Sequence, residues 1–278
     1  MLVRVFFMLR IIHFVQNLSL DITIGAMVSS WFIGDILGVP ASTPMIAGLG
    51  IAIWLIYTAD HLFDAQKAEG QIANPRHDFH RRYQKPILAL ALLIFGLGVY
   101  NAFQLPEKTI YYGLVLVGLS GLYFLYLRLS PSQRFKELFA ALVYTAGLFT
   151  GPLSLLSELG WPVMVLSLQF FLLAFANLLI LPMYEQEIDQ QQGVASVATR
   201  KGGKVVKFEA RIAIALSYGL IMLVVFLSDR FDQEAVIFTL MTSALLALVS
   251  KPSLFRQYQL YRLIGDGVFF LPALALLL

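Results

Sequence analysis

The stretch WPVMVLSLQFFLLAFANLLILPMYEQEIDQQQG, residues 161–193, joins a long apolar run directly to a cluster of acids and amides. Residues 161–183 carry no charge, and about 20 such residues are enough for a helix to cross the hydrocarbon core of a bilayer. A helix satisfies its own backbone hydrogen bonds, which lipid cannot do. Glu185 and Asp189 follow at once. The stretch therefore predicts a transmembrane helix with an acidic pair at its end.

The rest of the chain has the same apolar character. Of its 278 residues 59% are apolar and 13% are charged, whereas soluble domains have about 45–50% apolar and about 25% charged residues. The chain has no cysteine, which excludes disulfides, thiolate metal sites and cysteine nucleophiles. The sequence predicts one domain over residues 1–278, an all-α membrane bundle of nine transmembrane helices. The predicted spans are 22–39, 42–59, 86–105, 109–127, 138–157, 161–183, 211–228, 234–250 and 258–278.

The basic residues predict the orientation of this bundle. Of the 20 lysines and arginines, only Lys108 and Arg230 fall on one of the two faces that the nine spans define. Loops on the cytoplasmic side of membrane proteins are enriched in lysine and arginine, so the basic face is expected to be cytoplasmic. We expect a multi-pass integral membrane protein, surrounded by lipid, with its amino terminus in the cytoplasm and its carboxyl terminus on the opposite side.

The amino-terminal segment MLVRVFFMLRIIHFVQNLSL, residues 1–20, combines apolar and basic residues as a secretory signal does. Arg10, His13 and Gln16 interrupt its apolar run early, and a clear small-residue cleavage site is missing. We therefore expect an amphipathic helix that lies at the membrane interface and leads into the first span.

A second acidic pair ends the second predicted span. The stretch YTADHLFDAQ, residues 57–66, contains Asp60 and Asp64, four residues apart like Glu185 and Asp189. Residues four apart lie on one side of a helix, and the two spans run in the same direction, so both pairs emerge at the same boundary. Four carboxylates close to lipid repel one another and favour a bound cation. Oxygen ligands suit Mg²⁺, which readily shares its shell with phosphate oxygens.

Basic residues follow both acidic pairs and also occupy the cytoplasmic loop between them. Carboxylates for Mg²⁺ with cations around them predict a site for a polyphosphate headgroup. The segment KGGK at 201–204 lacks the spacing of a phosphate-binding P-loop, so nucleotide hydrolysis is not supported.

The first acidic pair resembles a motif of the UbiA superfamily of intramembrane prenyltransferases. That motif reads Asn-Asp-x-x-Asp-x-x-x-Asp, and its last two acids match Asp60 and Asp64. Ile56 and Tyr57 stand where the family has Asn and Asp, so the chain resembles a divergent member.

The second acidic pair resembles the second motif of the same family. That motif reads Asp-x-x-x-Asp followed by Gly-x-x-Ser, and here Glu185, Asp189, Gly193 and Ser196 stand in register with it. Glu185 replaces the first Asp. The resemblance covers nearly the whole chain, and it implies nine helices around a central cavity that opens near the cytoplasmic face.

The resemblance implies a Mg²⁺-dependent transferase that moves an isoprenyl group from an isoprenyl diphosphate to a lipophilic acceptor, either an aromatic or quinone-type compound or a lipid. Neither a nucleic acid nor an obligate protein partner is expected. The expected catalytic and metal-binding residues are Asp60, Asp64, Glu185 and Asp189. The expected diphosphate-binding residues are Arg81, Lys85, Arg128, Arg134, Lys136 and Arg200. The expected residues of the substrate pocket are Tyr57, Tyr123, Tyr126, Tyr144, Asn177 and Tyr184.

The sequence is also compatible with two other functions. A terpene cyclase would use the same site without an acceptor, and the altered residues Ile56 and Tyr57 favour keeping that alternative, because cyclisation needs no acceptor. A transporter or a non-catalytic membrane protein is the other alternative. Transporters usually place their coupling charges near the middle of the bilayer, whereas both acidic pairs are expected at one face.

Overall fold

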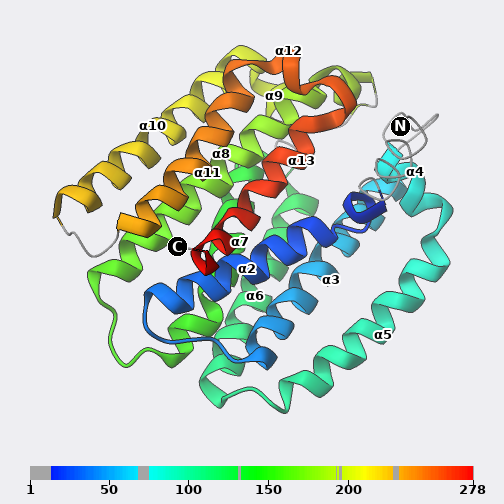
Figure 1. The fold of residues 1–278 in the computed structure, drawn as a ribbon. Helices are drawn as coiled ribbons and strands as arrows, with labels where there is room; N and C mark the ends of the chain where they lie inside the picture. The colour runs from blue at the N-terminus through cyan, green and yellow to red at the C-terminus, as the bar shows by residue number, and fades with distance from the viewer. Residues whose placement is uncertain are drawn as a thin grey trace, which may run out of the picture.

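The structure is a computed structural model that describes residues 14–67, 75–130, 133–191, 193, 196–227 and 232–277. Over these ranges the chain forms helices and no strand, and most of the helices run roughly along one common axis (Figure 1). The prediction of an all-α fold is therefore confirmed for the described residues. The amphipathic helix expected at the amino terminus falls mostly on residues 1–13, outside these ranges.

Seven of the described helices are long and apolar enough to cross a membrane. Each coincides with one of the predicted spans, and apolar composition is what allows these residues to stay helical in lipid. The seven are α3 (Thr43–Lys67), α5 (Gln84–Ala102), α6 (Glu107–Leu129), α7 (Lys136–Leu155), α8 (Trp161–Gln191), α10 (Gly203–Leu227) and α11 (Asp232–Ser250).

The first and last predicted spans have a different form. The first is α2 (Leu20–Ile36), with 17 residues. The last begins as α13 (Leu260–Gly267) and continues as the 3₁₀ helix η3 (Val268–Leu276). Pro272 lies inside η3, and a proline has no N–H for the hydrogen bonds of a regular α-helix. The structure thus confirms seven predicted spans as helices of membrane-crossing length, and the count of nine stays a prediction.

Helix α8 lies at the centre of the bundle. It contacts α7, α10, α11 and α13, and 61% of its most apolar stretch is buried. Phe170, Leu173 and Ile180 on α8 are fully buried and form part of one continuous apolar core. In α5 and α6 only 6% of the corresponding stretch is buried, so these two helices lie at the periphery and direct most of their apolar side chains outward.

One end of the bundle carries short helices. These are α4 (Pro75–Arg82), α9 (Val197–Lys201) and α12 (Pro252–Phe255), and they lie at the end where α3 and α8 finish and α7 and α13 begin (Figure 1). Helices α3 and α8 both continue beyond their apolar runs, through Lys67 and Gln191. The acidic pairs therefore lie on helical extensions at this end rather than in loops.

Candidate active site

A cavity of about 290 Å³ opens between α3, α6, α7, α8 and α13. Its apolar walls come from inner parts of these helices and include Leu49, Leu116, Val143 and Leu178. Its polar residues come mainly from the end of the bundle that carries the short helices. They are Tyr57, Asp60, Ser120, Tyr123, Lys136, Glu137, Tyr144, Glu185, Asp189, Ser196, Arg262 and Asp266.

The two acidic pairs meet at this cavity. Asp60 on α3 lines one wall, and Glu185 and Asp189 on α8 line another. Asp64 lies one helical turn beyond Asp60 on α3, with its side chain outside the described part of the structure. Asp189 is buried, and Asp60 and Glu185 are partly buried. The common direction of α3 and α8 thus brings three of the four predicted acids to one cavity.

Glu185 forms the closest charge pair at the cavity. Arg262 on α13 donates from Nε to Glu185 Oε1 at 2.7 Å, and its Nη2 lies 2.7 Å from the same oxygen. The hydroxyl of Tyr261 donates to Oε1 at 3.3 Å. The Tyr261 ring stacks on the Tyr184 ring with 4.4 Å between their centroids, which fixes the start of α13 against α8. Both charged side chains are mostly buried, with 12% of Arg262 and 17% of Glu185 exposed.

A second buried charge pair joins α7 to α9. Arg200, predicted as a diphosphate ligand, donates from Nη2 to Glu137 Oε2 at 3.1 Å. Glu137 Oε1 also accepts the backbone N–H of Val197 at 3.1 Å, and Ser196 caps α9 through the N–H of Thr199. These bonds hold α9 against the start of α7, beside the acids of the cavity.

The other predicted basic residues divide into two groups. Lys136, the first residue of α7, lines the cavity. Arg81, Lys85, Arg128 and Arg134 are exposed and do not line it. Their positions on α4, at the start of α5, at the end of α6 and before α7 place them at the same end of the bundle as the acids.

The predicted pocket residues also divide. Tyr57, Tyr123 and Tyr144 line the cavity. Tyr126, Tyr184 and Asn177 do not line the cavity, and each has a hydrogen bond of its own. The Tyr126 hydroxyl accepts the N–H of Phe135 at 3.0 Å, the Tyr184 hydroxyl donates to the Leu248 carbonyl at 2.7 Å, and Asn177 Nδ2 donates to Asp266 Oδ1 at 3.3 Å.

Arg262, Glu137 and Asp266 are cavity residues outside the site predicted from the sequence. Arg262 appears in the sequence only as one basic residue of the predicted cytoplasmic face. Glu137 precedes one predicted span and Asp266 lies in another, each without an acidic partner four residues away. Their places at the cavity depend on how α7 and α13 dock on α8, which no local spacing indicates.

The carboxylates at the cavity provide part of a ligand set for a magnesium ion. Asp60 and Asp189 offer carboxylate oxygens from two walls, as a hard cation requires. At Glu185, Arg262 and Tyr261 surround Oε1, so a metal ion held by this residue would have to bind through Oε2. Among the side chains that the structure describes, no three His, Asp or Glu residues are grouped closely enough to hold a metal ion.

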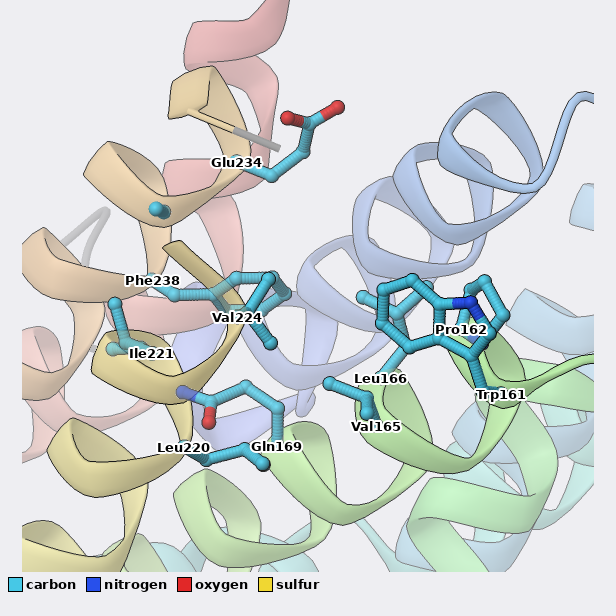
Figure 2. A pocket seen from close by; sticks show the side chains of 11 residues that line it. Trp161, Pro162, Val165, Leu166, Gln169, Leu220, Ile221, Val224, Glu234 and Phe238 are labelled. Carbon is cyan, nitrogen blue, oxygen red and sulfur yellow. The ribbon is translucent and has the colours of Figure 1, made fainter. Parts of the chain in front are cut away.

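A second cavity, of about 30 Å³, lies between α8, α10 and α11 (Figure 2). Trp161, Leu166 and Phe238 contribute to its apolar walls, and Gln169 lies at its base, where Nε2 donates to Ser217 Oγ at 2.7 Å. This volume is about that of a single water molecule, far below the size of an isoprenyl diphosphate. The larger cavity is therefore the candidate active site.

Two solved structures have the fold of this chain. One is the apo structure of a UbiA homologue from Aeropyrum pernix K1, with a TM-score of 0.66 and 14% sequence identity over 92% of this chain and 96% of that chain. The other is a UbiA homologue from Archaeoglobus fulgidus bound to DMAPP and Mg²⁺, with a TM-score of 0.60 and 15% identity over the same shares. No protein-family model matches the sequence, and no curated protein matches it either.

These matches give the chain the UbiA fold over nearly its whole length. They confirm the structural side of the resemblance that the two acidic motifs indicated, at an identity low enough to make the chain a divergent example of the fold.

Proposed function

We propose that this chain is an intramembrane prenyltransferase that uses Mg²⁺ and an isoprenyl diphosphate. The observation that carries the proposal is the polarity of the 290 Å³ cavity, which has acids and cations at one end and apolar walls further in. An isoprenyl diphosphate has the same division into a charged headgroup and a hydrocarbon tail. The A. fulgidus homologue, bound to DMAPP and Mg²⁺, supports this choice of ligand.

Asp60, Asp64 and Asp189 are the proposed magnesium ligands. The metal supplies charge neutralisation for the departing diphosphate. Lys136 would contact the headgroup directly, while Arg200 would act through the Glu137 contact that places α9. The exposed cations Arg81, Lys85, Arg128 and Arg134 would raise the local concentration of an anionic headgroup at this end of the bundle.

The tyrosines that line the cavity would stabilise the allylic cation left after ionisation. An aromatic face near a cation contributes roughly 0.5–2 kcal/mol. Tyr57 and Tyr144 come from facing helices, α3 and α7, and Tyr123 comes from α6. A wall of aromatic and aliphatic side chains also excludes water, which would otherwise capture the cation. The product would then form with a lipophilic acceptor that enters from the membrane.

A terpene cyclase is the second candidate. Ile56 lines the cavity at the position where the family motif has Asn. This side chain cannot form a hydrogen bond with an acceptor substrate. Cyclisation needs no acceptor. The position of the acids at one end of the bundle disfavours the transporter alternative.

The proposed site faces the cytoplasm. The basic residues at its end of the bundle support this orientation, with the amino terminus inside and the carboxyl terminus on the opposite side of the membrane.

The proposal is tested by incubating the purified protein with Mg²⁺, labelled geranylgeranyl or farnesyl diphosphate, and a membrane lipid extract. We expect label in a lipophilic product, loss of at least about 100-fold in diphosphate release for Asp60→Asn and Asp189→Asn, and activity close to wild type for Glu187→Gln. Glu187 lies on the same helix as Asp189 with 76% of its side chain exposed, so it is a matched control.

A labelled hydrocarbon or terpene alcohol formed without the extract would favour the cyclase. Equal diphosphate release by the wild type, Asp60→Asn and Asp189→Asn would refute both enzymatic functions.

A further inference from the structure

Arg262 is the cation most firmly placed at the candidate active site. Its guanidinium has five N–H donors in one plane. The edge formed by Nε and Nη2 faces Glu185 Oε1 at 2.7 Å. Nη1 makes no hydrogen bond to any residue within the described ranges, and Arg262 lines the cavity. One edge of the guanidinium is therefore fixed by the protein, while the other edge can donate hydrogen bonds to a ligand in the cavity.

The surroundings of Arg262 identify the chemistry of that ligand. Asp189 lies one turn beyond Glu185 on α8, and Asp266 lies one turn beyond Arg262 on α13. Both acids line the cavity, together with Lys136 and Ser196. The Glu185 charge is compensated by Arg262, so this wall carries less negative charge than two uncompensated carboxylates would. Guanidinium groups bind phosphate oxygens through two parallel hydrogen bonds, and they keep their charge at any physiological pH.

We propose that Arg262 is a direct ligand of the substrate's diphosphate, taking at the α8 wall the place that a metal ion on Glu185 would occupy, and that Glu185 is a positioning residue for Arg262. This inference rests on the proposed function, because it assigns a role in binding the same diphosphate. It differs from the prediction from sequence, which places Glu185 among the metal ligands and leaves Arg262 without a role.

The test measures binding of inorganic pyrophosphate to the full chain in detergent by calorimetry, once with Mg²⁺ and once with EDTA. Because Arg262 acts without a metal, we expect Arg262→Gln to weaken pyrophosphate binding about tenfold or more in both buffers. Arg262→Lys keeps the charge and loses the fork, so its loss is expected to be smaller. Arg256→Gln is the matched control, since Arg256, at the end of α12, forms an exposed pair with Glu187 on α8.

The magnesium requirement distinguishes a positioning role of Glu185 from a role as a metal ligand. Glu185→Gln is expected to leave the Mg²⁺ concentration for half-saturation within about twofold of wild type, whereas loss of a metal ligand typically costs much more. The double variant Glu185→Gln, Arg262→Gln leaves no unpaired buried charge, so it keeps the test valid if the single variants unfold. The double variant is expected to lose pyrophosphate affinity like Arg262→Gln.

Three results would overturn the proposal. These are wild-type pyrophosphate affinity in Arg262→Gln, wild-type affinity in the double variant, or a rise of tenfold or more in the Mg²⁺ requirement of Glu185→Gln. If the wild type itself binds no pyrophosphate with Mg²⁺, the proposed function fails and the Arg262 proposal fails with it. Normal binding by the wild type with an unaffected Arg262→Gln refutes the Arg262 role alone.

Discussion

The buried pair between Glu137 and Arg200 gives a prediction whose size follows from the structure. Breaking a fully buried ion pair costs about 3–5 kcal/mol, because one charge is left without a partner. Here 9% of the Glu137 side chain and 20% of the Arg200 side chain are exposed, so water compensates part of that cost. Glu137→Gln also keeps one acceptor for the Val197 N–H. We expect a loss of about 2–3 kcal/mol in the free energy of unfolding.

Thermal unfolding in detergent measures this loss. One kcal/mol corresponds to a shift in Tm of about 2–4 °C for a protein of 150–250 residues, so Glu137→Gln should lower Tm by roughly 4–12 °C. The matched control is Glu209→Gln. The Lys201–Glu209 pair is short, at 2.7 Å, but 37% and 31% of its side chains are exposed, so its loss should cost at most about 1 kcal/mol. Equal Tm shifts in the two variants would refute the reasoning that burial of the Glu137 pair stabilises this end of the bundle.

Two further predictions concern packing around the cavity. A Cβ at residue 265 would lie 2.6 Å from Oδ1 of the buried Asn177, so Gly265→Ala should lower the free energy of unfolding by about 1–3 kcal/mol, as measured by thermal unfolding. The control is Gly219→Ala, where a Cβ would meet nothing within 4 Å, and this variant should be neutral or stabilising. Equal effects of the two substitutions would contradict the close approach of α13 to α8. Tyr184→Phe removes the 2.7 Å hydrogen bond to the Leu248 carbonyl of α11 and should lower the free energy of unfolding by about 1–2 kcal/mol. Diphosphate release should be unchanged, because this hydroxyl bonds to α11 and not to the cavity. A loss of activity without a loss of stability would show instead that the hydroxyl acts in the site.

The sequence predicts the spans well because lipid imposes a simple rule on composition. A run of about 20 uncharged residues has to be helical in a bilayer, and this rule finds α8 and the six other candidate spans. The rule does not give the true ends. It stops α8 at residue 183, whereas the helix continues through Gln191, because acids and glutamines extend a helix into water as readily as apolar residues do.

The acidic residues of the candidate site also follow from the sequence. Spacing by four puts each pair on one side of its helix, and the direction of the spans brings Asp60, Glu185 and Asp189 to the same end of the bundle. Both steps depend only on helix geometry and on counting spans.

The partners of these acids do not follow from the sequence. Arg262 is 77 residues from Glu185 along the chain, and their contact depends on the rotation of α13 against α8. The spans are apolar on all sides, so no polar stripe marks which side of a helix faces the cavity. This explains why Tyr144 lines the cavity while Tyr126 and Tyr184, predicted by the same reasoning, bind backbone groups elsewhere.

The central claim is that a metal ion and a diphosphate bind between the acids of α3 and α8. Its most direct test is a crystal structure of the protein grown with Mn²⁺ and a non-reactive isoprenyl thiolodiphosphate, with the metal located by its anomalous signal. We predict a manganese peak beside Asp60 and Asp189, with the diphosphate in the 290 Å³ cavity and the isoprenyl chain along its apolar walls. Ordered metal and diphosphate at another place on the molecule, with these acids bound only to the protein, would contradict the account.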